Sequence, residues 1–320
     1  MMQRRSLRWF SAKIAVSQMV AVLQMVAVLQ MLAGGSLLAQ TLTFTDILKR
    51  PPIQADARIA YGKDPLQFGD LWLPPASAGN GPHPVIVLIH GGCWLADLPG
   101  VELTHFMADD LRKSGFAVWE LEYRRVGHPG GGYPGTFLDV ANGADFLRSI
   151  ADKYNLDLNR VIASGHSAGG HLAIWLAARP HLPKDSPLNL PSPLPIHRVV
   201  GVAAISDLAY YAKAGAHACG DDTVAKLLDV DVRGKADKLA PFRDTSPTQL
   251  FPIGVKQILV YGVYDGIVPP AMGLRHQMQA AAKKETVEVV TIANAGHFEL
   301  ISPWTAPWKD VSAIFARALK

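Results

Sequence analysis

The sequence predicts an α/β fold in which helices wrap a mostly parallel central sheet. Two observations lead to this prediction. Short apolar runs rich in β-branched residues alternate with runs of helical spacing, as in sheets built from strand-helix-strand units. Residues 160–173, RVIASGHSAGGHLA, join one such apolar run to a helical run through a glycine-bracketed turn. With 320 residues, 49% of them hydrophobic, the chain is long enough for one large core.

The expected elements follow one another within a single domain at 40–320. Residues 57–61 and 67–73 alternate in polarity, which predicts two antiparallel edge strands. Residues 41–52 are expected to form only a short connector. A helix is expected directly after Ser167. The other strands are expected at 84–89, 117–123, 161–163, 199–204, 257–262 and 287–292, and the other helices at 103–114, 137–154, 271–283 and 307–319.

Two irregular blocks interrupt this alternation. Residues 180–197 contain six prolines, which cannot continue a helix or a central strand. Residues 206–252 show no regular pattern. Because ligands bind outside the carboxyl ends of the strands in such sheets, both blocks are expected to form a small lid over Ser167.

Residues 1–39 are expected to be an export signal. Residues 1–13 are basic, residues 14–38 carry no charge, and small residues precede a possible cut before Gln40. This predicts an exported protein, periplasmic or secreted. An uncleaved signal anchor is the alternative, because about twenty apolar residues can span a bilayer. It would then be the only membrane contact.

The formal net charge of +4 comes from this leader. Its basic residues are Arg4, Arg5, Arg8 and Lys13, and no acidic residue precedes Asp46, so the charge falls to zero when the leader is removed. No basic stripe remains, which excludes nucleic acid as an expected partner. The oligomeric state is not predicted.

Ser167 is expected to be a catalytic nucleophile. A serine hydroxyl is a weak nucleophile unless it is exposed, aimed at a carbonyl and hydrogen-bonded to a base. A sharp turn between strand and helix provides the aim, and Gly165 and Gly169 allow the two backbones to approach. The same turn places the N–H of Ala168 at a helix N-terminus, where it can stabilise an oxyanion.

Asp265 and His297 are expected to complete a triad with Ser167. Each residue follows a predicted strand, and together they give the chain order Ser, Asp, His that this topology requires. His297 would act as general base and then as general acid. Asp265 would hold the imidazole tautomer and stabilise its cation.

The HGGCW stretch at 90–94 is expected to supply the second oxyanion donor. Its glycines are Gly91 and Gly92, and the N–H of Gly92 or Cys93 is favoured as the donor. His90 is expected to brace the loop. Trp94 is expected either to line the substrate pocket or to belong to the core.

No metal and no cofactor are expected. His166 and His171 lie five residues apart, which does not place two ligands on one helical face, and no H-x-x-x-H motif or cysteine pair supports a zinc site. His166 is instead a candidate for the substrate pocket.

Cys93 and Cys219 are the only cysteines. An exported protein meets oxidising conditions, so a disulfide that pins the lid to the oxyanion loop is expected. Two buried free thiols are the alternative.

From about Asp56 onward, the chain resembles an α/β-hydrolase of the esterase/lipase branch, with its HGG-x oxyanion motif and its G-x-S-A-G-G elbow. The resemblance implies hydrolysis of carboxylic esters through an acyl-enzyme. Cys93 stands where the motif has a third glycine, and residues 125–136 replace a proline-rich stretch of the acyl pocket. The matching residues are Gly91, Gly92, Ser167, Ala168, Asp265 and His297.

The same motifs also resemble those of kynurenine formamidase. Amide hydrolysis, by an arylformamidase or by a peptidase of the prolyl oligopeptidase type, is therefore the alternative activity. A binding protein without catalysis is a further alternative, which an intact triad disfavours. The expected partner is a small-molecule ester or amide.

Overall fold

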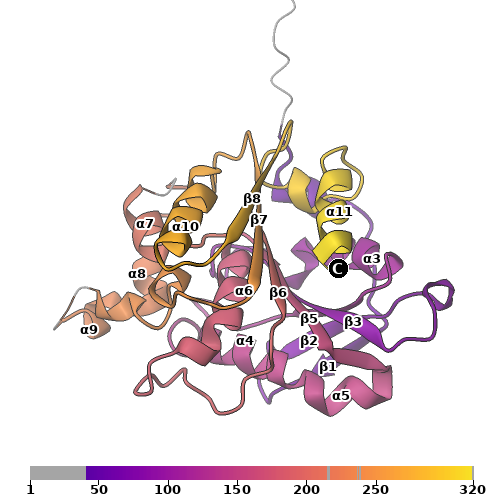
Figure 1. Cartoon of the computed structure of the whole chain (residues 1–320), viewed down its shortest axis with the longest axis horizontal. Coiled ribbons are helices and arrows are strands. Elements are labelled where there is room, and N and C mark those ends of the chain that lie inside the picture. The colour runs from indigo at the N-terminus through magenta and orange to yellow at the C-terminus, as the bar shows by residue number, and fades with distance from the viewer. Residues whose placement is uncertain (1–40, 215–216, 236, 238, 319–320) are drawn as a thin grey trace, which may run out of the picture. The chain divides into compact units, whose positions relative to one another are not determined.

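The computed structural model describes residues 41–214, 217–235, 237 and 239–318 (Figure 1). The export signal expected at 1–39 lies outside these residues. Within the described part of the chain, no helix is long and apolar enough to cross a membrane.

One eight-stranded sheet has the strand order β1-β2-β4-β3-β5-β6-β7-β8. β2 pairs antiparallel with β1 and with β4, and all other neighbouring strands are parallel, which confirms the predicted sheet. The strands are β1 Ala57–Ala60, β2 Phe68–Trp72, β3 His83–Ile89, β4 Ala117–Leu121, β5 Leu156–His166, β6 Arg198–Val202, β7 Lys256–Gly262 and β8 Val287–Ile292.

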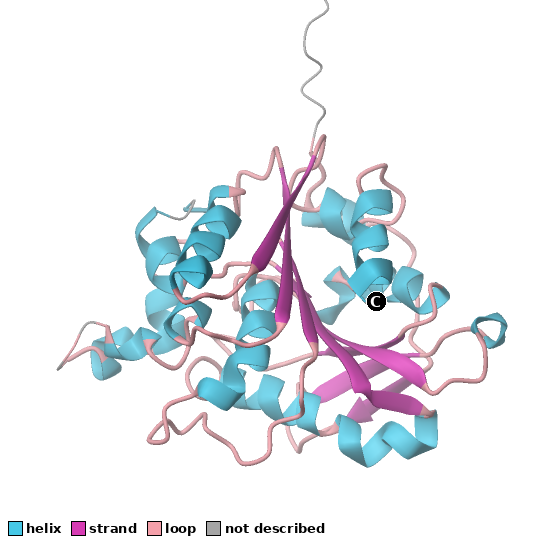
Figure 2. Ribbon diagram, in the orientation of Figure 1, coloured by secondary structure: helices cyan, strands magenta, loops and turns pink. Residues whose placement is uncertain are grey.

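Helices cover both faces of the sheet, as Figure 2 shows. Helices α6 and α10 pack on one face, and α3 and α11 pack on the other. Central strands such as β3 are consequently buried on both faces, which explains their continuous apolar sequence. The helices are α2 Phe44–Leu48, α3 His105–Lys113, α4 Gly135–Asp145, α5 Leu147–Tyr154, α6 Ala168–Ala178, α7 Leu208–Ala214, α8 Thr223–Leu228, α9 Val230–Arg233, α10 Ala271–Ala282 and α11 Trp308–Ala318.

Three segments differ from the predicted elements. The helix expected at 137–154 is divided into α4 and α5 at Phe146, whose carbonyl accepts from the N–H of Ser149 at 2.8 Å in a tighter turn. The connector expected at 41–52 contains α2. The block 206–252 is largely helical, with α7, α8, α9 and several 3₁₀ turns.

The block 180–197 lies at the edge of the sheet away from Ser167. It joins the end of α6 to the start of β6, and a segment between a helix and the next parallel strand lies at the amino ends of the strands. There the N–H of Leu194 donates to Asp145 at 2.6 Å. The prediction that this block covers Ser167 is therefore wrong.

Candidate active site

Ser167 lies on a strained turn between β5 and α6. Its φ of 56° and ψ of −117° fall in a region that non-glycine residues rarely adopt, which costs about 1–3 kcal/mol. Hydrogen bonds hold the turn, because the Ser167 N–H donates to Val202 at 2.9 Å and its carbonyl accepts from the N–H of His171 at 3.1 Å. The turn therefore fixes the position from which the side chain projects.

The glycines that bracket Ser167 are required by close backbone contacts. A Cβ on Gly165 would lie 2.3 Å from the carbonyl oxygen of Gly169. A Cβ on Gly169 would lie 2.0 Å from the carbonyl oxygen of Ile89. Any side chain at either position would force β3, β5 and α6 apart, so the sequence pattern follows directly from the geometry of the turn.

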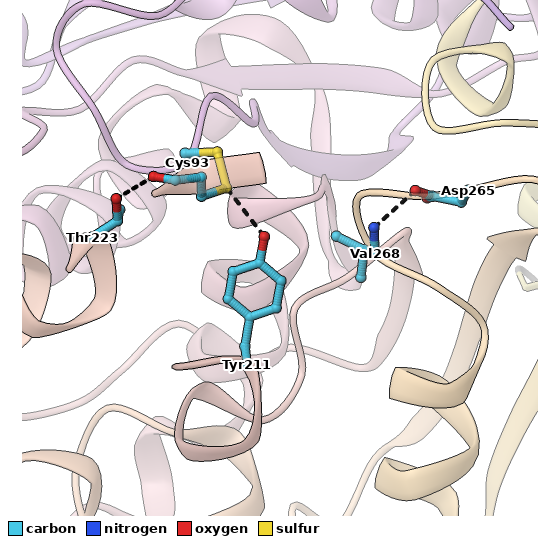
Figure 3. The surroundings of a disulfide bond; sticks show 6 residues. Cys93, Tyr211, Thr223, Asp265 and Val268 are labelled. Carbon is cyan, nitrogen blue, oxygen red and sulfur yellow. Dashed lines mark hydrogen bonds between the residues drawn. A yellow bond between two sulfur atoms is a disulfide. The ribbon is translucent and has the colours of Figure 1, made fainter. Parts of the chain in front are cut away.

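Asp265 and His297 lie beyond the carboxyl ends of β7 and β8 and contact one another. His297 Nδ1 lies 2.7 Å from Asp265 Oδ2. The other oxygen, Oδ1, accepts from the N–H groups of Ile267 and Val268, each at 2.8 Å, and Figure 3 shows the bond from Val268. The carboxylate is fully buried, so these three contacts fix both its position and the orientation of the imidazole.

The loop at 90–94 is braced from behind by a buried ion pair, as expected for His90. His90 Nε2 lies 2.9 Å from Glu122 Oε1, and the imidazole stacks on Tyr123 with ring centroids 4.5 Å apart. Burial alone would raise the pKa of Glu122, but the charge and the hydrogen bond of His90 outweigh it and lower the pKa to about 2. Glu122 is therefore ionised at neutral pH.

Ser167 and His297 line one cavity of about 290 Å³. Two of the predicted oxyanion residues, Gly92 and Cys93, line it as well, whereas Gly91 and Ala168 are buried beside Ser167. The remaining lining residues are Thr43, Phe44, Leu98, Pro99, Leu103, His166, Ala218, Ile267 and Phe298.

The two candidate pocket residues have different positions. His166 lines the cavity. Its Nε2 lies 3.1 Å from the carbonyl oxygen of His297, and the centroids of the two imidazole rings are 4.3 Å apart. Burial, followed by the charge of His297, holds the pKa of His166 well below its ordinary value. Trp94 belongs to the core, where it packs edge-on against His171, so its placement in the pocket is wrong.

Several lining residues were missed by sequence reasoning. Ile267 and Phe298 follow Asp265 and His297 closely in the chain, and this proximity could have identified them. Phe44 lies in a segment that shows no catalytic motif. Of the two predicted lid blocks, only the second contributes, through Ala218.

Cys93 and Cys219 form a disulfide with a Cα–Cα distance of 5.5 Å, which confirms the predicted bond (Figure 3). The Tyr211 hydroxyl donates to Cys219 Sγ at 3.2 Å, and the Thr223 hydroxyl donates to the Cys219 carbonyl. The disulfide thus ties the block 206–252 to the loop 90–94 and brings Ala218 to the cavity.

Among the described residues, one cluster outside the cavity could hold a metal ion. The ligand atoms of Asp70, His105 and Glu120 lie within 4.8 Å of one another. Arg58 already donates to both oxygens of Asp70, at 2.7 and 2.8 Å. The expected absence of a metal stays a prediction.

Residues 70–275 match the BD-FAE family. The chain belongs to this family. Among curated relatives of this BD-FAE member, esterase LipC of Mycobacterium tuberculosis is 26% identical over 81% of this chain and 64% of its own length. The probable isoprenylcysteine alpha-carbonyl methylesterase ICMEL1 of Arabidopsis thaliana is 30% identical over 36% of this chain and 23% of its own length. The BD-FAE member thus spans less than two thirds of these relatives.

Solved structures share the fold of this BD-FAE member. Esterase B from Lactobacillus rhamnosis superposes with a TM-score of 0.71 at 20% identity, over 95% of this chain and 94% of its own. A truncated carbohydrate esterase from gut microbiota superposes with a TM-score of 0.67 at 19% identity, over 85% and 98%. The fold is therefore that of the α/β-hydrolase esterases. The relation to kynurenine formamidase stays a prediction.

Proposed function

We propose that this protein is a serine hydrolase that cleaves neutral carboxylic esters through an acyl-enzyme. One observation carries the proposal: an imidazole oriented by a buried carboxylate, His297 on Asp265 at 2.7 Å, shares a cavity with a serine on a strained turn. The esterase names of LipC and of the superposed structures support it.

In this mechanism Ser167 Oγ attacks the ester carbonyl while His297 Nε2 accepts the hydroxyl proton. Asp265 stabilises the resulting imidazolium. The carbonyl oxygen becomes negatively charged and is held by the N–H of Ala168, at the start of α6, together with the N–H of Gly92 or Cys93. His297 then returns the proton to the departing alcohol, which leaves an acyl group on Ser167.

Water then hydrolyses the acyl-enzyme with the help of the same residues. His297 takes a proton from water, the hydroxide attacks the acyl carbonyl, and the acid leaves as Ser167 regains its proton. His166 stays neutral beside His297, because burial disfavours its charged form. A second imidazolium therefore does not oppose the proton transfer.

The cavity favours an uncharged substrate group. No Lys, Arg, Asp or Glu is found among the described residues that line it, and Leu98, Leu103, Ile267 and Phe298 are apolar. A charged group would lose its hydration there without gaining a partner. We therefore assign a small neutral ester as the substrate class, with an amide as the alternative.

We also propose that the protein is exported. The disulfide between Cys93 and Cys219 supports this location, because such bonds persist in oxidising compartments. The leader expected at 1–39 would direct the export.

Replacement of the nucleophile tests the proposed activity. Ser167→Ala should lower kcat for p-nitrophenyl acetate on the order of 10⁶-fold and abolish labelling by a fluorophosphonate. Ser164→Ala is the matched control, because this serine lies in β5 just before the turn, donates to the Val200 carbonyl at 2.7 Å and is not among the residues that line the cavity. Full activity of the Ser167 variant would disprove the assignment.

The choice between ester and amide needs a second measurement. The wild-type kcat/KM is compared for p-nitrophenyl esters and N-formylkynurenine. A preference for the esters supports the proposal, whereas a preference for the formamide reverses it.

A further inference from the structure

The segment that follows the expected leader forms part of the wall around Ser167. Thr43 and Phe44 line the cavity, although no motif marks them. Phe44 is 37% exposed as well as lining the cavity, whereas Ile47 of the same helix is buried in the core. The short helix α2 therefore places one aromatic ring between solvent and the proposed catalytic residues.

Hydrogen bonds hold this segment in place. Asp46 accepts from both the N–H and the hydroxyl of Thr43, at 2.9 and 2.7 Å, in a capping box that fixes the start of α2. The N–H of Leu42 donates to Glu299. The second oxygen of Glu299 accepts from the N–H of Gly296 at 3.0 Å, so one carboxylate ties the segment to the loop that carries His297.

Phe44 closes the gap between two walls of the cavity. Its ring packs edge-on against Phe298, with centroids 6.3 Å apart. On the other side, α2 contacts the turn 101–103, which contributes Leu103. Gly92 and Cys93, which carry the proposed oxyanion donors, line the same cavity, so an ester whose carbonyl oxygen bound to them would have Leu98, Leu103 and Phe44 within reach of its acyl group.

We propose that Phe44 is a specificity-determining residue that restricts the enzyme to esters of short acyl groups. The inference rests on the proposed function. The cavity of about 290 Å³ is slightly smaller than the range of about 300–1,000 Å³ usual for ligand sites. A long acyl chain must displace the ring of Phe44, which is packed on Phe298 and anchored through α2.

The experiment compares acyl-chain profiles of variants in the full chain. The kcat/KM values are measured for p-nitrophenyl acetate, butyrate and octanoate. Phe44→Ala should raise the octanoate-to-acetate ratio, by roughly fourfold for each methylene that it newly accommodates, since a buried methylene contributes about 0.8 kcal/mol. Phe44→Trp should lower the same ratio.

Leu48→Ala is the matched control. Leu48 lies on the same helix, is 41% exposed and is not among the lining residues, so its variant should keep the wild-type profile. Thermal unfolding shows whether each Phe44 variant is folded. Because Phe44→Ala shortens the side chain and Phe44→Trp enlarges it, the test stays decisive if one of the two folds poorly.

The outcomes separate this inference from the proposed function. A wild type that hydrolyses none of the three esters contradicts the proposed function. A wild type that hydrolyses them, together with unchanged profiles in the folded Phe44 variants, overturns only the role of Phe44. Opposite shifts in the Ala and Trp variants support it.

Discussion

Two clusters of this protein combine a histidine with buried carboxylates, one carboxylate in the first and two in the second, and the sheet gives them different surroundings. Asp265 and His297 lie on loops beyond the carboxyl ends of β7 and β8, and His297 faces a cavity. Asp70 and Glu120 lie opposite one another within β2 and β4, and His105 of α3 packs beside them. The first cluster has space for a ligand next to it, whereas the carboxylates of the second lie at paired positions inside the sheet.

The partners of the carboxylates differ in the same way. One oxygen of Asp265 accepts hydrogen bonds from backbone N–H groups, and the other is hydrogen-bonded to His297. Asp70 instead has a cationic partner in Arg58, and Glu120 accepts from the Trp72 indole at 2.8 Å. A buried histidine beside carboxylates is therefore not sufficient evidence of catalysis, since the position at a strand end next to a cavity distinguishes the two clusters.

A matched pair of substitutions gives the largest expected contrast. Asp265→Asn should lower kcat for p-nitrophenyl acetate by about 10⁴-fold, because an amide no longer holds the required imidazole tautomer. Asp70→Asn should leave kcat within about threefold of wild type and instead lower the free energy of unfolding by about 1–3 kcal/mol, since it weakens the hydrogen bonds that a buried carboxylate accepts from the half-exposed Arg58.

Both variants are assayed for kcat and for unfolding by denaturant. Equal losses of activity in the two variants would contradict the distinction between the clusters. A large loss of stability in Asp265→Asn alone would assign that residue a structural role instead.

The disulfide gives the second contrast between the two clusters, because it joins segments beside the cavity and not segments beside Asp70 and Glu120. The double variant Cys93→Ser/Cys219→Ser should lose about 2–5 kcal/mol of unfolding free energy. It should also lower kcat/KM, since Ala218 and the oxyanion loop are no longer held together at the cavity. Chemical denaturation and ester hydrolysis test both effects. Wild-type stability in the double variant would contradict a structural role for the bond.

The elbow and the pairing of Asp265 with His297 could be predicted because they follow from local patterns. Strand ends are readable from apolar runs, and the chain order of the three residues follows the topology. The catalytic roles of these residues stay predictions. The contribution of Phe44 could not be predicted, because it depends on a contact between Leu42 and Glu299, 257 residues apart in the chain.

The two wrong assignments have separate physical reasons. The prolines of 180–197 correctly indicate an irregular segment, but composition does not say at which edge of the sheet the segment lies. Its place between α6 and β6 decides that. Trp94 lies two residues after Gly92, yet its side chain turns into the core, which a sequence position alone does not reveal.

The third contrast concerns proton uptake by the enclosed cluster. Burial raises the pKa of Glu120 to about 7, although His105, Thr104 and Trp72 oppose the shift and Asp70 adds to it. Between about pH 4.5 and 7 Glu120 therefore holds a proton in the folded protein that it loses in the unfolded chain, so the contribution of this group to the unfolding free energy falls as the pH rises. Glu120→Gln should remove this contribution and gain on the order of 3 kcal/mol over wild type at pH 8 relative to pH 5.

Glu122, two residues further along, is the matched control with the opposite sign. Its pKa is lowered to about 2, so its contribution to stability is present above about pH 4.5 and is lost as the pH falls through 2. Glu122→Gln should therefore be less stable than wild type at pH 5 and at pH 8 alike. Urea unfolding of both variants at these two pH values checks the prediction, and parallel behaviour of the two variants would show that burial does not control the protonation of Glu120.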